Sequence, residues 1–248
     1  MVVINKIKRL INKFRKQEKI NYISDEFIDW LCFANAGMLE RGNIWCFDYA
    51  ISNLPSLAPI IEIGSFCGLS TNVITYLKLK HGVENKLICS DAWQFEGAED
   101  AGTLGKHPYI QHQEYKEFVK SNFEKNISFF SKHDLPFAVE LKSNDFFEQW
   151  RQNKNVNDVF GRRTQLGEKI SFAYIDGNHT YDAVLCDFQN VDSFLEIGGF
   201  ILFDDSADDS GWEVCQVVNE IAKSARYQLI KKNPNYLFKK LEHLEKMH

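Results

Sequence analysis

The most constraining feature of this 248-residue sequence is an alternation of short apolar runs with helical patterns from residue 59 onward. Five runs rich in β-branched and aromatic residues predict strands, and each is followed by a segment with helical spacing. Strands that alternate with helices in this way predict a parallel, doubly wound α/β sheet. The predicted strands are residues 59–64, 85–91, 137–142, 170–176 and 198–205.

The segments around these strands complete the predicted architecture. Residues 226–241 show two strand patterns around Asn-Pro-Asn, which predicts a closing β-hairpin that a plain dinucleotide-binding fold would lack. The helix after the first strand is expected to begin with Ser70 as its N-cap, and residues 152–168 read as a hydrophilic loop. Helical patterns before the first strand predict an N-terminal cap or arm over residues 1–55 and one ligand-binding domain over residues 56–248.

Composition excludes several classes of protein. A net charge of −5 gives no basic face, so no nucleic-acid partner is expected. The six cysteines form no CxxC pair, which favours reduced thiols and a cytoplasmic protein. Lysines interrupt the first apolar stretch, which argues against a secretory signal, and no apolar run reaches the length of about 18 residues that a membrane span needs.

The charge is unevenly distributed along the chain. Residues 1–20 hold seven lysines and arginines against Glu18, a net charge of +6, so the remaining 228 residues carry −11. Two roles are open for this basic arm: packing on its own domain or on a second subunit of a homo-oligomer, or peripheral contact with an anionic membrane through residues 1–19. The arm's apolar residues recur at helical spacing: Ile4, Ile7, Leu10, Ile11 and Phe14.

Acidic residues end most of the predicted strands. In an open α/β sheet, ligands bind outside the carboxyl ends of the strands, so these residues are candidates for a site. An aspartate at a strand end often caps the next helix instead, but acids along nearly the whole edge favour a ligand site. The candidates are Glu62, Gly64, Asp91, Asp145, Asp176, Asp204 and Asp205.

The turn after the first strand, EIGSFCGLST, predicts part of a cofactor site. Gly64 allows a sharp turn, Gly68 allows close approach of a ligand, and the following helix offers free amide groups. Phe66 stands where the dinucleotide motif GxGxxG would have a glycine. Asp91, at the end of the second strand, can accept both hydroxyls of a ribose. Together these residues predict a cofactor of the adenosine type.

With these segments the sequence resembles a family. IIEIGSFCGLST, CSDAW, YIDGNHTYDAVLCDF and LEIGGFILFDDS follow the order and spacing of class I S-adenosylmethionine-dependent methyltransferases. The IDGxHxY…D and GGxxxxDD segments are most similar to the branch of macrolide-sugar and other small-molecule O-methyltransferases. The resemblance implies a Rossmann-like, seven-stranded and mostly parallel sheet with a reversed C-terminal strand. It also implies that S-adenosylmethionine is bound by Glu62, Gly64, Ser65, Gly68, Asp91, Trp93 and Asp145.

The resemblance further implies a metal site, because in several relatives the acids that end strands four and five hold a divalent cation. Here these are Asp176, Asp204 and Asp205. Three converging carboxylates repel one another unless a cation or protons neutralise them, and oxygen ligands suit Mg²⁺ or Mn²⁺. His179 would then serve as the general base, with Asp176 beside it in the catalytic site. In the alternative reading His179 caps a helix or bonds a carbonyl, and Asp205 is an N-cap.

The sequence therefore predicts methyl transfer from S-adenosylmethionine to a hydroxyl of a small molecule, sugar or glycan, assisted by a divalent metal. Two alternatives are a non-catalytic cofactor-binding protein of the same fold and an NAD-type Rossmann oxidoreductase. Determinants of the acceptor are expected in residues 20–50, 94–111 and 152–168.

Overall fold

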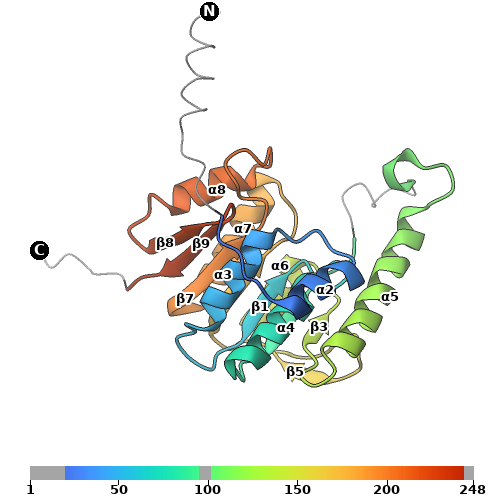
Figure 1. The fold of residues 1–248 in the computed structure, drawn as a ribbon, viewed down its shortest axis with the longest axis horizontal. Helices are drawn as coiled ribbons and strands as arrows, with labels where there is room; N and C mark the ends of the chain where they lie inside the picture. Colours follow the sequence, from blue (N-terminus) through green and yellow to red (C-terminus); the bar gives the residue numbers. More distant parts are fainter. Residues whose placement is uncertain (1–19, 95–101, 243–248) are drawn as a thin grey trace, which may run out of the picture.

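The structure is a computed structural model that describes residues 20–94 and 102–242. It contains a seven-stranded sheet in the order β3-β2-β1-β6-β7-β9-β8 (Figure 1). Neighbouring strands run parallel except where β9 pairs with β7 and β8. The strands are β1 (Ile60–Ile63), β2 (Leu87–Ser90), β3 (Phe137–Val139), β6 (Ile170–Ile175), β7 (Leu195–Phe203), β8 (Tyr227–Lys232) and β9 (Tyr236–Lys240). The predicted doubly wound sheet with a reversed last strand is confirmed.

Helices cover both faces of this sheet. In Figure 1, α2, α3 and α4 lie on the near side, and α5 runs along one edge of the molecule. A short 3₁₀ helix, η1 (Leu104–Lys106), precedes α5. The α-helices are α2 (Glu26–Ala34), α3 (Arg41–Ile51), α4 (Leu69–His81), α5 (His112–Phe130), α6 (Ser143–Arg151), α7 (Tyr181–Asp192) and α8 (Val214–Ile221).

The core consists of two apolar layers, one on each face of the sheet. Side chains alternate between them along each strand: in β6, Phe172 and Tyr174 face one layer, and Ala173 and Ile175 face the other. Helices α2 to α5 pack on the first layer, and α6 to α8 pack on the second. Because both faces are covered, the central strands are largely apolar, and most of the polar chemistry is left to their ends.

The sheet order fixes where a ligand can bind. β1 pairs with β2 on one side and with β6 on the other. The strand order therefore reverses at β1: β2 and β3 follow on one side of it, and β6 and β7 on the other. A crevice forms outside the carboxyl ends of the strands at such a switch point. The turns after β1, β6 and β7 therefore lie at one edge, which is where the sequence places its glycine turn and its strand-end acids.

Two local expectations were wrong. Ser70 is not an N-cap: α4 begins at Leu69 after Gly68, and the Ser70 hydroxyl donates instead to Glu62. The segment 152–168 is not a plain loop, because β4 (Asn155–Asn157) and β5 (Arg163–Gln165) form an antiparallel pair within it. These strands are too short and too polar to show an apolar alternation in the sequence.

The N-terminal predictions are only partly within the described residues. Helices α2 and α3 contribute Ile28, Leu31, Ile44 and Phe47 to the same apolar layer as the strands. The basic arm, residues 1–19, lies outside the described residues, as do residues 95–101 of the predicted acceptor segment. Within the part of the chain that the structure describes, no helix combines the length and apolarity that crossing a bilayer requires.

Candidate functional site

The turn after β1 is built around two glycines with positive φ. Gly64 has a φ of 82°, and a Cβ on it would lie 1.9 Å from the backbone oxygen of Asp176. Only glycine therefore lets the end of β1 approach the end of β6 so closely. Gly68 has a φ of 85°, and a Cβ there would meet Ile127 on α5 at 2.8 Å. The close approach at Gly68 thus serves helix packing as well as the turn.

Asp91 holds this turn from the end of β2. One carboxylate oxygen accepts hydrogen bonds from the backbone amides of Ser65 and Phe66 at 2.7 and 2.9 Å, and the other accepts from Trp93 at 2.6 Å. Burial raises the pKa of Asp91, and the three amides act in the opposite direction. Phe66 can therefore adopt a φ of 45°, an uncommon value for a non-glycine residue, in the position where the dinucleotide motif has glycine.

Trp93 and Glu62 lie behind the turn, where neither side chain is open to solvent. Trp93 is 1% exposed, and its indole nitrogen donates to the carbonyl of Phe66 at 2.9 Å. Glu62 is fully buried and accepts from the hydroxyls of Ser65, Ser70 and Thr71 at 3.1, 2.5 and 2.5 Å. Burial raises the pKa of Glu62, while these hydroxyls lower it. Both residues support the shape of the turn from the inside.

A small cavity lies against the outer side of the turn. Three elements meet there: the segment between α2 and α3, the glycine turn with the start of α4, and the end of β6. The lining residues are Gly37, Met38, Leu39, Ser65, Phe66, Leu69, Ser70 and Asp176. The cavity therefore joins the predicted cofactor turn to the predicted catalytic acid, and its outer wall belongs to the segment 20–50 in which acceptor determinants were expected.

Three titratable side chains gather at the ends of β6 and β7. Nε2 of His179 lies 3.2 Å from Oδ2 of Asp205 and 3.8 Å from Oδ1 of Asp176. One ligand atom from each residue lies within 4.8 Å of the others, a spacing that suits a metal ion. Nε2 is buried and makes no hydrogen bond to any residue that the structure describes. Of the predicted set Asp176, Asp204 and Asp205, the structure thus brings Asp176 and Asp205 together, with His179 as the third member.

The two carboxylates in this group are held close to other negative charge. The pKa of Asp176 is raised well above its usual range by burial and then by the charges of Asp204 and Asp205. Burial and the Asp204 charge also raise the pKa of Asp205, while His179 lowers it. Groups arranged in this way bind a proton or a cation more readily than an isolated carboxylate does.

Asp204 does not join the group, in contrast to its predicted role as a metal ligand. It is 4% exposed, and one of its oxygens accepts from Asn43 at 2.7 Å, from Asn235 at 2.5 Å and from the backbone amide of Asp205 at 3.0 Å. The other oxygen accepts from the hydroxyl of Tyr174 at 2.6 Å. Asp204 is therefore a buried acceptor that fixes the end of β7, and the His179 imidazole takes its place in the half-buried group.

The remaining candidates lie away from this group. Asp145 is exposed in the first turn of α6, after β3, and does not line the cavity. Arg162 is bound within the β4–β5 segment, where it pairs with Asp158 and donates to the carbonyl of Leu135 at 2.8 Å. Arg162 thus stabilises the segment 152–168, in which acceptor determinants were expected.

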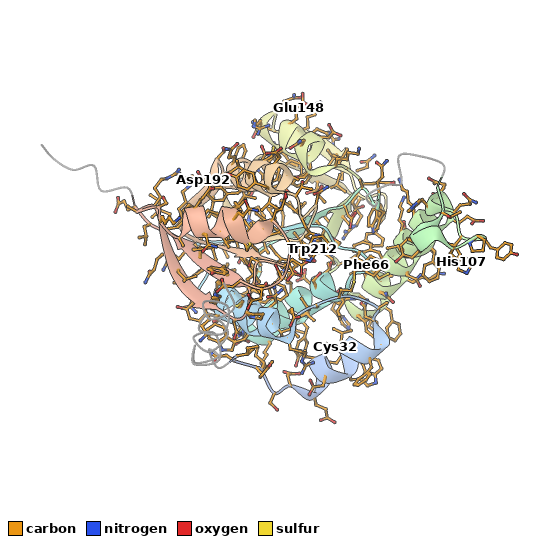
Figure 2. All side chains as sticks on the ribbon, turned by 90° about the horizontal axis from the view of Figure 1, so that it is seen from above. Cys32, Phe66, His107, Glu148, Asp192 and Trp212 are labelled. Carbon is orange, nitrogen blue, oxygen red and sulfur yellow. The ribbon has the colours of Figure 1, made fainter. Side chains whose placement is uncertain are left out.

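Sequence reasoning missed several residues of the site. Trp212 lies between β7 and α8, with its ring centroid 4.7 Å from that of His179. In Figure 2, seen from above, Trp212 lies near the centre of the molecule toward Phe66, whereas Cys32 and His107 lie farther out. Tyr174 could have been found, because it lies two residues before Asp176 and strand residues at that spacing share a face. Asn43 and Asn235 carry no comparable signal.

Comparisons with solved structures identify the fold. An O-methyltransferase from Bacillus cereus, solved in complex with SAH, matches with 12% identity and a TM-score of 0.51, over 96% of this chain and 97% of its own. A TDP-rhamnose 3'-O-methyltransferase of calicheamicin biosynthesis matches with 14% identity and a TM-score of 0.53, over 91% and 99%. The O-methyltransferase NovP matches with 13% identity and a TM-score of 0.52, over 80% and 79%.

A family model described as "Methyltransferase domain" matches residues 61–206, more than half of the chain. With the fold, this match defines the class of the protein: it is a class I S-adenosylmethionine-dependent methyltransferase. The chain belongs to this methyltransferase-domain family. No significant match was found among curated proteins.

Proposed function

We propose that this protein transfers the methyl group of S-adenosylmethionine to a hydroxyl oxygen of a small molecule or sugar, with a divalent cation at the acceptor. The observation that carries this proposal is the cavity in which Asp176 faces Ser65, Phe66 and Ser70 of the cofactor turn. Next to it, His179 has a buried nitrogen without a hydrogen-bond partner among the described residues. A cofactor and a proton acceptor would therefore lie side by side at this edge of the sheet.

The protein's own residues divide the work of the reaction. The amides of Ser65 and Phe66 already donate to Asp91, so the cofactor would be held by the backbone amides at the start of α4, directly after the glycine turn. When bound, S-adenosylmethionine supplies a methyl group. Its bond to sulfur breaks, and the electron pair stays on sulfur, as the bond from the acceptor oxygen to the methyl carbon forms. His179 would take the proton of the acceptor hydroxyl on Nε2. The negative charge of Asp205, whose Oδ2 lies 3.2 Å from Nε2, would stabilise the positive charge that the imidazole then carries.

The residues present fit a divalent cation. Asp176 and Asp205 offer two carboxylates whose pKa values are raised by burial first and then by the surrounding negative charge. Mg²⁺ is commonly held by one or two carboxylates, with water and substrate oxygens completing the shell. A cation held there would lower the pKa of a hydroxyl bound beside it. We assign the ligand role to the two carboxylates and keep His179 as the base, because imidazole is a poor ligand for Mg²⁺.

The acceptor class is suggested by the similar proteins. One of them is named as a methyltransferase of TDP-rhamnose, and its fold spans 91% of this chain. A sugar hydroxyl is a weak acid, so it needs the base and the cation that this site can provide. Sugar nucleotides, simple glycosides and phenols are therefore the acceptors to test.

The experiment follows formation of S-adenosylhomocysteine from S-adenosylmethionine with each acceptor in the presence of Mg²⁺. We expect activity with at least one hydroxylated acceptor, loss of activity in EDTA and recovery with added Mg²⁺ or Mn²⁺. Replacing His179 by glutamine should lower kcat by about 10²- to 10⁴-fold, since a general base contributes a factor of that size. Calorimetry should show that the H179Q variant still binds S-adenosylhomocysteine and does not bind NADH. Full activity of H179Q would remove His179 from its role as the base.

A further inference from the structure

Trp212 places a large aromatic surface directly beside the group that would carry out the chemistry. Its indole is 46% exposed, and its ring centroid lies 4.7 Å from that of His179 with the two planes tilted by 43°. Trp93 and Trp150, by contrast, are both 1% exposed. One side of the Trp212 ring system therefore contacts the predicted base, while much of the rest is open to a molecule that enters the site.

The loop that carries Trp212 is fixed at several points. The backbone amide of Ala207 donates to Asn235 at 3.0 Å, and the hydroxyl of Tyr236 donates to Asp208 at 2.6 Å. At the other end of the loop, Glu213 accepts from the backbone amide of Tyr181 at 2.7 Å. Because the loop is already ordered, binding a ligand against the indole would cost little additional conformational entropy.

The backbone also turns the indole toward its position next to His179. Gly211 immediately precedes Trp212 and has a φ of 84°, which a side chain would strain even though nothing lies within 4 Å of where its Cβ would be. Asp205, at the start of the same loop, has a φ of 51°. Two left-handed residues thus frame a loop whose carboxylate and indole both face His179.

The surroundings select the chemistry of the ligand. The face of an indole carries negative charge density, which attracts the weakly positive C–H groups on the face of a sugar ring. The carboxylate of Asp205 lies beside the same imidazole and is an acceptor, so it favours a ligand that presents hydroxyl donors. Its negative charge disfavours an anionic ring. A neutral polyhydroxylated ring meets these conditions better than a flat phenol or a carboxylate does.

We propose that Trp212 is the platform for the acceptor, on which a neutral sugar ring lies with its reacting hydroxyl toward His179. This proposal rests on the proposed methyl transfer for its meaning, but it concerns binding and can be tested separately. The ring would contact the indole through its C–H face while a hydroxyl at its edge reaches the carboxylate of Asp205. Trp212 would thereby set the specificity for sugars rather than take part in proton transfer.

The direct test is a titration of the protein, saturated with S-adenosylhomocysteine and Mg²⁺, with methyl α-L-rhamnopyranoside and with methyl β-D-glucopyranoside. The indole N–H resonance of Trp212 is assigned in a ¹⁵N spectrum by its loss in Trp212→Phe. We expect at least one glycoside to move this resonance in a saturable way, while the resonance of Trp30, exposed on α2, stays in place. If neither glycoside moves the Trp212 resonance, or if both tryptophans respond alike, the proposal is overturned.

Kinetics separate a platform from a residue that acts through His179. With an acceptor glycoside, Trp212→Ala should raise KM by about five- to tenfold, as expected for loss of one aromatic contact, and Trp212→Phe should raise it less. The pH dependence of kcat and the affinity for S-adenosylhomocysteine should stay unchanged, as they should in the control Trp30→Phe. A shifted pH profile with an unchanged KM would make Trp212 a positioning residue and overturn the platform. Absence of methyl transfer with a normal resonance shift would instead contradict the proposed function alone.

Discussion

Two adjacent aspartates at the end of β7 have different environments, although the sequence gives them the same appearance. Asp204 is buried with four hydrogen-bond donors around it, whereas Asp205 is part of the half-buried group with His179. The φ of 51° at Asp205 turns the chain between them, so the two side chains do not share a surface. The rule that strand-end acids gather at one edge finds both residues, but it does not tell a ligand from a buried acceptor.

Replacing each of the two by asparagine should separate these roles. In Asp204→Asn, an amide replaces an oxygen that accepts hydrogen bonds, so buried donors lose their partner and the free energy of unfolding should fall by about 1–3 kcal/mol. Asp205→Asn should leave stability nearly unchanged and weaken Mn²⁺ binding. Denaturant unfolding and calorimetric titration with Mn²⁺ measure the two effects. Loss of Mn²⁺ binding in a fully stable Asp204→Asn protein would return Asp204 to the set of ligands.

Asp91 illustrates how a predicted ligand residue can also hold the structure. The sequence suggests a ribose acid, and the structure shows its carboxylate already accepting three backbone amides of the glycine turn. A carboxylate has about four lone-pair directions, so it can keep these bonds and still meet a hydroxyl. The sequence motif places Asp91 at the end of β2, next to the glycine turn. Its hydrogen bonds to that turn depend on backbone geometry, which a sequence motif does not encode.

The Asp91→Ala variant should therefore lose stability and cofactor affinity together. Removing the carboxylate leaves the backbone amides of Ser65, Phe66 and Trp93 without an acceptor, which should lower the free energy of unfolding by about 1–3 kcal/mol. Asp91→Asn keeps one oxygen acceptor and should lose less stability. Thermal unfolding and calorimetry with S-adenosylhomocysteine test both variants. An Asp91→Ala protein that matched the parent in both measurements would show that the turn is held by other contacts.

At the scale of elements, Asp187 connects helices α7 and α6. It is 5% exposed and accepts a hydrogen bond from the hydroxyl of Ser143 in the first turn of α6. Burial raises the pKa of Asp187 to about 6, although the Ser143 hydroxyl lowers it. The folded protein thus holds a proton on Asp187 at pH values where the unfolded chain has released it.

This shift predicts a specific pH dependence of stability. Between about pH 4 and pH 6 the folded state binds more protons at Asp187, so the free energy of unfolding should fall as the pH rises through this window. The total change is about 3 kcal/mol, the energy that corresponds to the difference between the two pKa values. Asp187→Asn should remove this contribution and be more stable than the parent at pH 7. The measurement is denaturant unfolding of both proteins from pH 4 to pH 8, and parallel pH curves would contradict it.

The sequence predicted the elements of the sheet better than their surroundings. Apolar runs such as 170–176 are long, uniform and followed by helical spacing. The strands and their parallel direction could therefore be inferred. The pair β4 and β5 has three residues in each strand, of which only Thr164 is buried, and so leaves almost no pattern. Ser70 resembled an N-cap because a hydroxyl near a helix start usually is one, but the buried Glu62 uses it instead.

At the scale of the whole molecule, the site depends on contacts between distant segments. Asn43 on α3 reaches Asp204, 161 residues away, and Asn233 before β9 accepts from the backbone amide of Asn21 at 2.6 Å, 212 residues away. Pairings of this range are decided by packing of the complete chain, so no local motif predicts them. The reversed strand β9 therefore does more than close the sheet: together with Asn235 it joins the N-terminal segment to the end of β7.

The charge distribution predicts that the whole protein binds anionic membranes through residues 1–19. Residues 1–19 carry a net charge of +6 on a body of −11, and their apolar residues repeat at helical spacing. We expect the full chain to sediment with vesicles that contain anionic lipid, because basic residues contribute about 1 kcal/mol each near such a surface. Binding should weaken with added salt and be lost when residues 1–19 are deleted.

The same deletion also tests the rival role of the arm. If the arm binds a membrane, the shortened protein should keep its thermal stability, its oligomeric state and its affinity for S-adenosylhomocysteine. It should lose only its binding to vesicles. A matched variant with Lys6, Lys8 and Arg9 replaced by glutamine keeps the apolar spacing, and it should bind vesicles less tightly than the parent. The opposite outcome has two parts: the deletion unfolds the protein or dissociates an oligomer, and the parent does not bind vesicles. In that case the arm packs on protein, and membrane contact is ruled out.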